Sequence, residues 1–402
     1  MPPPRSPLRR DVGGRLPLRR RGLVAVGVAV VAVVAVAIAV MGYRRVNEQT
    51  APVTQGPSLS PGFDAVVPAS PSPRAAAAAC TRVATVDATG ATDVTSKLQA
   101  FIAGSPRGSV VCLAPGGRYR TEGTLELEET NNLTIDGRGA TIFATERSGD
   151  PRVQIGTSAP GSTIRNLTIQ GFWPDAGTAN AVNPGYEGNH GIAVRGASDV
   201  EIGPGVQITD VAGDGVYLTS GGDEPSIKWA DRVRIHDSTI KRTGRMGVAI
   251  TDGARNIGIE DNAFDAIALY VFDIEPNGHV FNGEAAGADN VRFSDNRIGS
   301  YGLSPALTPL MVAGTGNGPQ TNVEVSRNVV TGLPLRIGVW SVEGSPRENF
   351  WITDNTSDTV AEGPTMTFEG VKGLTLSGNT QPLSGGPLAR ISDTVTTAPD
   401  LP

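Results

Sequence analysis

The chain is poor in cysteine, in aromatic residues and in charge. Two cysteines among 402 residues exclude a disulfide-dense miniprotein, and 18% charged residues exclude a coiled coil or a highly charged disordered chain. Aromatic residues make up only 5%, and histidine occurs three times. The net charge of −6 argues against a nucleic-acid partner, because phosphate binding needs a concentrated basic surface.

The motifs of several enzyme classes are also missing. The sequence contains no Gly-x-Ser-x-Gly nucleophile turn, no Cys/His zinc spacing and no phosphate-binding loop. No dinucleotide fingerprint follows a βαβ pattern. Function therefore has to be inferred from the hydrophobic patterning and from the polar residues that accompany it.

One long hydrophobic run lies near the N-terminus, from Gly22 to Tyr43. Its 22 uncharged residues are enough to cross a bilayer as a helix. Seven arginines precede it and only Arg44 and Arg45 follow directly, which predicts a cytoplasmic N-terminus and an exported remainder. A cleaved signal peptide is the alternative, but its apolar core is usually about 7–15 residues long. We expect a basic cytoplasmic segment at 1–21, a single-pass anchor in the cell membrane at 22–43, and an extracytoplasmic main domain.

The segment after the anchor differs in composition from the rest of the chain. Residues 44–79 are rich in Pro, Ser, Ala and Thr without an apolar period, which predicts a disordered linker. A folded domain is expected over 80–380 and a loose tail over 381–402. Cys80 and Cys112 lie at the start of this domain, where an oxidising compartment permits a disulfide; two buried free thiols are the alternative.

A short phrase recurs through the main domain at intervals of 24–34 residues. Each copy alternates apolar and polar residues, the pattern of a short strand with one buried face. The nine copies begin at Asn132, Asn166, Asp199, Arg232, Asn256, Asn290, Asn322, Asn349 and Gly373. A second column follows in the later copies, with Asn262, Asn296, Asn328, Asn355 and Asn379. Stacked strands without long helices predict an all-β solenoid of about nine coils, with the asparagines stacked in its turns.

The start of the domain has its own pattern. Residues 93–102 place Val94, Leu98, Phe101 and Ile102 on one helical face, so we expect a helix that caps the open end of the solenoid, with Asp93 or Thr95 as its N-cap. Residues 110–119 supply a strand and a Pro-Gly-x-x-Tyr turn, and 132–142 read Asn-Leu-Thr-Ile-Asp-Gly-x-Gly-Ala-Thr-Ile.

This order of segments resembles the pectate lyase-like superfamily, over about residues 80–380. The resemblance implies a right-handed parallel β-helix. Members of the superfamily include polysaccharide lyases, glycoside hydrolases, uronan epimerases and phage adhesins, so the fold alone does not choose a reaction.

The strand after each phrase predicts where a site lies. Three consecutive apolar pairs are expected to point inward, and Ile274 is expected to continue the first column. These pairs are Ile192/Val194, Val216/Leu218 and Val248/Ile250. The outward columns are then Gly191, Gly215, Gly247 and Asp273, and Ala193, Tyr217, Ala249 and Glu275. The small residues predict a shallow open surface from which two carboxylates project.

Asp273 and Glu275 are the candidate catalytic residues of this surface. Two carboxyl groups at i and i+2 of one strand face the same way, at a separation that suits glycosidase chemistry, and crowding raises the pKa of one of them. Paired acids are also common on a solvated strand and also suit a Ca²⁺ site, so these alternatives stay open. Ca²⁺ is the one cofactor that the pattern admits.

Several polar residues are expected beside the pair. Asp214 is a candidate supporting acid or a hydrogen-bonded turn residue, and Arg245 a candidate clamp on a sugar carboxylate or a surface ion pair. Tyr217 is expected to stack on a sugar or to act as an acid. The candidate substrate-binding residues also include Asn189, His190, Arg242, Lys228 and Trp229. The insertions 173–188 and 219–230 carry aromatic residues that suit sugar stacking or that pack the loops.

Known family motifs are matched only in part. Residues 270–276 resemble the Tyr-Gly-Phe-Asp-Pro-His motif of alginate epimerases and related lyases at Tyr270, Phe272 and Asp273, without its histidine. The resemblance places Asp273 where those relatives keep an essential acid. We therefore expect a membrane-anchored, extracytoplasmic carbohydrate-active enzyme, a polysaccharide hydrolase or lyase acting on an envelope or environmental glycan. A non-catalytic glycan-binding or structural protein of the cell envelope is the alternative.

Overall fold

A computed structural model describes residues 79–128, 132–145, 154–222, 226–281, 283–342, 344–392 and 395–397. The predicted anchor at 22–43, the segments beside it and residues 44–78 of the predicted linker lie outside these ranges. Within them, no helix is both long and apolar enough to span a membrane.

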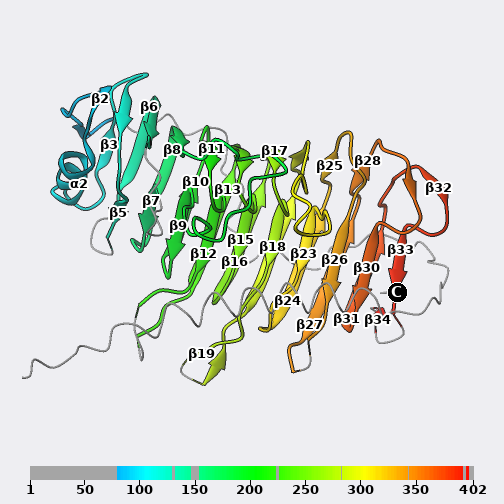
Figure 1. The fold of residues 1–402 in the computed structure, drawn as a ribbon. Coiled ribbons are helices and arrows are strands. Elements are labelled where there is room, and N and C mark those ends of the chain that lie inside the picture. The colour runs from blue at the N-terminus through cyan, green and yellow to red at the C-terminus, as the bar shows by residue number, and fades with distance from the viewer. Residues whose placement is uncertain are drawn as a thin grey trace, which may run out of the picture. The chain divides into compact units, whose positions relative to one another are not determined.

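The described chain is a stack of coils whose strands run parallel (Figure 1). One face is a ten-stranded parallel sheet in which each strand pairs with the equivalent strand of the next coil. Its strands are β5 (Leu125–Leu127), β7 (Ile155–Thr157), β9 (Ile192–Arg195), β12 (Val216–Thr219), β15 (Val248–Ile250), β18 (Phe272–Ile274), β23 (Val312–Gly314), β26 (Ile337–Trp340), β30 (Met366–Glu369) and β33 (Ala389–Ile391).

A twenty-stranded sheet forms the other faces in two columns. The first column holds β1 (Arg82–Val83), β3 (Val110–Cys112), β6 (Thr134–Phe143), β8 (Thr163–Gln170), β10 (Ser198–Ile202), β13 (Ala230–His236), β16 (Ala254–Glu260), β21 (Ala288–Ser294), β24 (Gln320–Ser326), β27 (Arg347–Thr353), β31 (Val371–Ser377) and β34 (Thr396–Thr397). The second holds the later halves of β6 and β8 with β2 (Thr89–Asp93), β4 (Arg118–Arg120), β11 (Gln207–Val211), β14 (Thr239–Thr243), β17 (Ala263–Ile267), β22 (Arg297–Ile298), β25 (Val329–Val330) and β28 (Thr356–Ser357). Two small pairs lie outside these sheets, β19 (Val280–Phe281) with β20 (Glu284–Ala285) and β29 (Ala361–Glu362) with β32 (Leu383–Gly385).

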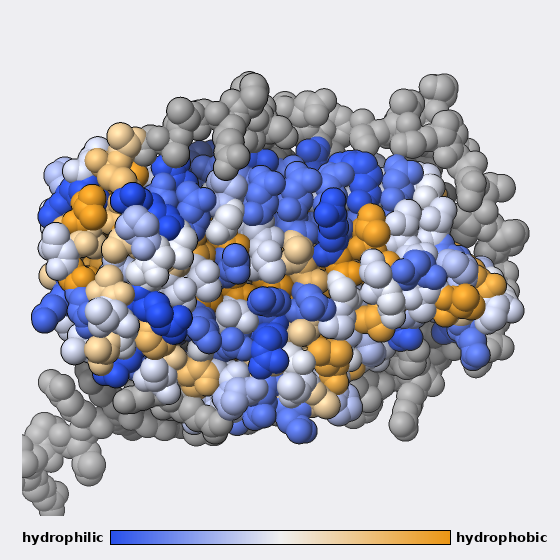
Figure 2. Space-filling view, turned by 90° about the horizontal axis from the view of Figure 1, so that it is seen from above, coloured by the Kyte–Doolittle hydropathy of each residue, from blue (hydrophilic) through white to orange (hydrophobic). Residues whose placement is uncertain are grey.

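The predicted repeat is confirmed as the strand-forming unit. The first residue of each of the nine phrases has a left-handed backbone, with φ between 38° and 70°. Asn132 lies just before β6, and the other eight lie within strands of the first column. Asn, Asp and Gly adopt this conformation at low cost, which explains why they start eight of the nine phrases. Apolar residues of each strand then point into one continuous core. The face seen from above is mostly hydrophilic, with hydrophobic residues in small groups (Figure 2).

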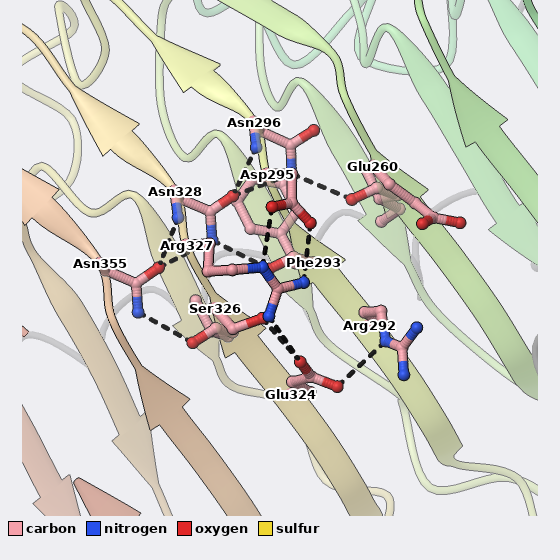
Figure 3. Close-up of polar contacts among 12 residues, drawn as sticks. Glu260, Arg292, Phe293, Asp295, Asn296, Glu324, Ser326, Arg327, Asn328 and Asn355 are labelled. Atoms are coloured by element: carbon pink, nitrogen blue, oxygen red, sulfur yellow. Dashed lines mark hydrogen bonds and ion pairs between the residues drawn. The ribbon is translucent and has the colours of Figure 1, made fainter. Parts of the chain in front are cut away.

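The asparagine column is confirmed as a ladder (Figure 3). Each side-chain NH₂ donates to the amide oxygen of the next asparagine, at distances of 2.8–3.2 Å along Asn262, Asn296, Asn328, Asn355 and Asn379. Each of the first four also donates to a strand carbonyl of the preceding coil. The left-handed backbone lies one residue earlier, for example at Asp261 and Asp295. The asparagines are therefore used for their buried amides rather than for their backbone freedom.

The N-terminal end follows the prediction with one change. Helix α2 (Thr95–Ala103) buries Leu98 and Ile102, and a disulfide joins Cys80 to Cys112 across a Cα–Cα distance of 5.6 Å. The N-cap residue is Val94, which has no capping side chain, so the expected N-cap was wrong. Asp93 instead accepts the Thr95 N–H at 2.9 Å.

The C-terminal segment 381–402 is not a loose tail over its described residues. Strand β33 within it pairs with β30 and is the last strand of the ten-stranded sheet. This sheet therefore has one strand more than the nine predicted coils.

Candidate functional site

The register of β18 differs from the expected one by two residues. Phe272 pairs with Val248, Asp273 with Ala249 and Ile274 with Ile250. The second inward residue is therefore Ile274, and the first is Phe272, which stacks on Phe293 in the core. Phe272 therefore fills the core position that the sequence pattern assigned to Ile274.

This register moves both candidate acids. Asp273 lies in one outward column with Ala193, Tyr217 and Ala249. Glu275 comes directly after β18, and its N–H donates to the Ile250 carbonyl at 2.8 Å. The two acids remain on one face, since they are two residues apart along an extended chain.

The glycine column does not form an open surface, so that expectation was wrong. A Cβ atom on Gly191 would lie 2.5 Å from the Ile208 side chain, and one on Gly215 would lie 2.4 Å from that of Ile240. Ile208 and Ile240 belong to the core. These glycines therefore allow a tight corner against the interior.

A second hydrophobic cluster covers the outer face of the ten-stranded sheet at this level. Met246, Leu269, Tyr270 and Leu310 pack on the outward alanines Ala249 and Ala313. Asp273 lies between those alanines in the sheet and is only 1% exposed. The Glu275 side chain is 31% exposed, so it is the accessible member of the pair.

Arg245 joins the acids of this region. Its guanidinium lies 3.4 Å from Glu275, 3.7 Å from Asp214 and 3.8 Å from Glu187. Burial would lower the pKa of Arg245, but the charges of Asp214, Glu275, Glu187 and Asp273 raise it above its usual value. Arg245 is therefore charged and holds four carboxyl groups around it; we call these five residues the acid cluster.

Asp214 is an ionised acid beside Arg245. Its side chain is fully buried, which would raise the pKa of the carboxyl, but Arg245 and His190 outweigh burial and lower that pKa. Its Oδ1 accepts the Met246 N–H at 3.1 Å. The Nδ1 atom of His190 lies 3.0 Å from the Asp214 N–H and 3.2 Å from its Oδ2.

Asp273 and Glu275 are shifted in the opposite direction. Burial and then the charge of Glu275 raise the pKa of Asp273 well above its usual value. Only one of its oxygens has a hydrogen bond, from the Thr315 hydroxyl at 3.2 Å, while the other is buried without a partner. Burial also raises the pKa of Glu275, against the opposing effect of Arg245. The pair therefore retains a proton at a pH at which exposed acids are ionised.

Two tyrosines lie beside the acid cluster. The Tyr217 ring stacks on that of His190, with centroids 4.4 Å apart, and its oxygen accepts the Thr251 hydroxyl at 3.1 Å. Burial raises the pKa of both Tyr217 and Tyr270, and the nearby acids raise it further. Both phenols therefore keep their protons at neutral pH.

The structure brings six of the predicted residues together: Asp214, Arg245, Asp273, Glu275, His190 and Tyr217. Asn189, next to His190, is buried and its side chain donates to the Tyr186 carbonyl. Arg242 lies elsewhere, where it pairs with Asp210 at 2.6 Å. Trp229 and Lys228 line a separate pocket. In the insertion 173–188, Trp173 is buried and packs the loop.

The sequence patterns did not identify Glu187, Thr315 and Trp340 as neighbours of this region. Trp340 ends β26, one coil beyond Thr315, and its ring lies over Gly338, where a Cβ atom would approach it to 2.3 Å. The signal was present in Ile337–Trp340, which has the alternation of the other strands. Glu187 lies in an insertion, where no periodicity locates a side chain.

No group of three or more His, Cys, Asp or Glu suited to a metal ion occurs among the residues that the structure describes.

Comparisons with known proteins agree with this architecture. The chain is similar to an alginate lyase from Paenibacillus sp. str. FPU-7, with 16% identity over 79% of this chain and 99% of the other and a TM-score of 0.55. It also resembles a polygalacturonase from Erwinia carotovora ssp. carotovora (16% identity; 85% of this chain and 100% of the other; TM-score 0.48). A third similar structure is the surface protein and adhesin PfbA from Streptococcus pneumoniae (11% identity; 77% of this chain and 96% of the other; TM-score 0.44). No curated protein matches the sequence.

At these identities the alginate lyase shows a shared fold, the parallel β-helix expected from the resemblance to pectate lyase-like proteins. A family profile described as "Right handed beta helix region" matches residues 153–380, more than half of the sequence. The chain therefore belongs to this family of right-handed β-helix proteins.

Proposed function

We propose that the protein is a carbohydrate-active enzyme that cleaves a polysaccharide, with Asp273 and Glu275 as the group that transfers the proton. The observation that carries the proposal is that the acids around Arg245 have pKa values shifted in opposite directions. Two carboxyl groups with raised pKa values lie beside a third, Asp214, whose pKa is lowered. Acids with separated pKa values are the usual basis of acid–base catalysis near neutral pH.

The roles follow from exposure and contacts. Glu275 is the member that a substrate reaches, so it donates or accepts the proton at the glycan. Asp273 lies behind it and keeps the pair protonated through its own burial. Arg245 holds Glu275 in place and provides positive charge for a sugar carboxylate. Tyr217 and Trp340, two coils away on either side along the ten-stranded sheet, offer aromatic faces on which sugar rings stack.

The class of substrate rests on the scaffold and its likeness to other proteins. The similar solved structure with a TM-score of 0.55 is described as an alginate lyase. The other similar structures include a polygalacturonase and an α-1,3-glucanase. Polysaccharide is therefore the substrate class that we propose. The hydrophobic run at 22–43 and the arginines before it support a location outside the cytoplasm, anchored to the membrane.

Product analysis tests the proposal. The full-length chain is incubated with alginate, polygalacturonate, carrageenan and α-1,3-glucan, and the products are identified by mass spectrometry. Products that gain a water indicate hydrolysis, and products with unsaturated ends indicate elimination. The Glu275→Gln and Asp273→Asn variants are compared with Glu348→Gln, which alters an acid on the twenty-stranded sheet that pairs with Lys372.

We expect Glu275→Gln to lower the rate about 100-fold or more, the usual contribution of a general acid or base. Glu348→Gln should retain the wild-type rate. The proposal is wrong if Glu275→Gln and Asp273→Asn both retain the wild-type rate on a cleaved substrate, or if none of the four glycans is cleaved.

One observation favours a second function, non-catalytic glycan binding. Asp273 is only 1% exposed, which leaves a single accessible carboxyl group where hydrolysis normally uses two. A binding protein would retain a glycan on the aromatic faces without releasing products. Retention of a glycan by the full-length chain with no change in its mass distribution would support this alternative.

A further inference from the structure

A pocket separate from the acid cluster lies at the corner where the ten-stranded sheet passes into the first column of the twenty-stranded sheet. It has a volume of about 490 Å³ and is lined by residues that include Gly196, Trp229, Asp231, Arg232, Arg255 and Phe281. None of its lining residues belongs to the acid cluster. The volume lies within the range of about 300–1,000 Å³ that is usual for small-molecule sites.

Two aromatic side chains form the apolar part of the pocket. Trp229 and Phe281 are both half-buried, and they come from different coils. The Trp229 ring lies against Gly253, where a Cβ atom would be 3.3 Å from the ring, and the Arg255 guanidinium lies 5.6 Å from its centroid. The ring is therefore held in one orientation before a ligand arrives.

The polar part of the pocket is also held in place. Asp231 is 8% exposed and accepts the Asn256 amide and the Arg232 guanidinium, each at 2.7 Å, while Arg255 lies 3.4 Å away. Arg232 makes two further bonds to Asp199, at 2.7 and 2.9 Å. Planar carboxylate and guanidinium groups thus stand fixed beside an aromatic face, with Arg255 still 47% exposed.

We infer that this pocket binds a pyranose unit of a glycan chain as a second, non-catalytic site. A sugar ring presents C–H groups on its faces, which suit Trp229 and Phe281, and hydroxyl groups at its rim, which suit Asp231 and Arg255. A phosphate dianion is a poorer match, because Asp231 and Glu284 line the pocket together with Lys228, Arg232 and Arg255, and Arg232 is already paired with two carboxylates. A neutral sugar or a singly charged uronate is compatible with this balance.

The pocket lies within reach of the acid cluster along a single segment. Phe281 lies six positions after Glu275, so their Cα atoms are at most about 22 Å apart. Asp252 fixes the segment between them, since it accepts the Asn277 N–H and the His279 ring nitrogen, each at 2.8 Å. A glycan of several sugars is therefore long enough to reach both places. The inference shares its ligand class with the proposed function but does not depend on catalysis.

Calorimetric titration of the full-length chain tests the inference. A Glu275→Gln parent prevents turnover, and the probes are hexasaccharides of alginate, polygalacturonate and α-1,3-glucan. Trp229→Ala and Trp229→Phe are made in this parent. Trp351→Ala serves as the matched control, because Trp351 is another half-buried tryptophan, on β27 of the twenty-stranded sheet.

We expect at least one hexasaccharide to bind, with Trp229→Ala raising its Kd tenfold or more. Trp229→Phe keeps an aromatic face and should change the Kd by less than about threefold, as should Trp351→Ala. The inference is wrong if no hexasaccharide binds, or if Trp229→Ala and the parent bind equally. Failure of the proposed function would look different, since the wild-type chain would then release no products while Trp229-dependent binding persisted.

Discussion

The buried asparagine ladder provides a quantitative test of what holds the coils together. Asn296 is fully buried, and its side chain makes four hydrogen bonds, of which the one to Asn328 is drawn in Figure 3. It donates to the Asn328 amide oxygen at 3.0 Å and the Ile259 carbonyl at 2.9 Å. Its oxygen accepts the backbone N–H and the side-chain amide of Asn262, at 3.0 and 3.2 Å. Asn296→Ala removes all four bonds at once.

The expected loss follows from this count. Each buried hydrogen bond contributes about 1 kcal/mol net, so Asn296→Ala should lower the free energy of unfolding by about 4 kcal/mol. Asn379→Ala is the matched control at the end of the ladder, where the side chain is half-buried and water replaces part of what is lost. We expect Asn379→Ala to lower the free energy of unfolding by about 1–2 kcal/mol.

Urea denaturation followed by circular dichroism measures both values. Asn296→Asp adds a test of geometry, because a carboxylate oxygen in place of the NH₂ group would face two acceptors, the Asn328 amide oxygen and the Ile259 carbonyl. It should destabilise at least as much as alanine at neutral pH. A loss below about 1 kcal/mol for Asn296→Ala, or equal losses at Asn296 and Asn379, would refute the ladder as a main source of stability.

Three further predictions concern charge and covalent structure. Asp273→Asn should stabilise the fold at neutral pH, since the raised pKa of Asp273 makes ionisation of this carboxyl in the folded state costly above about pH 4. In urea titrations the gain in unfolding free energy should shrink as the pH falls towards about 4. A gain that does not change with pH would contradict the prediction. Burial would lower the pKa of His236, but hydrogen bonds from its ring to Glu201 and Asp237 raise it, so its stabilisation is present below about pH 6.5 and is lost as pH rises above the folded-state pKa. His236→Gln should therefore cost more at about pH 6 than at about pH 9, and equal costs would exclude a charged imidazole. Cys112→Ser opens a cross-link between residues 32 apart in sequence and should cost about 3–4 kcal/mol, after which a reductant should have no additional effect.

The sequence by itself determined the repeating unit and its stacking. Alternation of apolar and polar residues is a property of a single strand, and its recurrence with Asn or Asp at the corners is visible without any tertiary contact. The asparagine ladder and the helical cap were predictable for the same reason, since each depends on spacing along the chain. The pairing of Cys80 with Cys112 was predicted from the count of two cysteines, with two free thiols as the alternative.

The tertiary structure alone decided the environment of the acids. The register of β18 depended on whether Phe272 or Ile274 fills the first core position opposite Val248, and packing against Phe293 chose Phe272. Side chains from the coil of Asp273 and from the coils on either side pack on this face, and Glu187 reaches Arg245 from an insertion. Burial and charge at a point in space are sums over residues far apart in sequence, so strand periodicity identified the carboxyl groups but not their pKa values or their exposure.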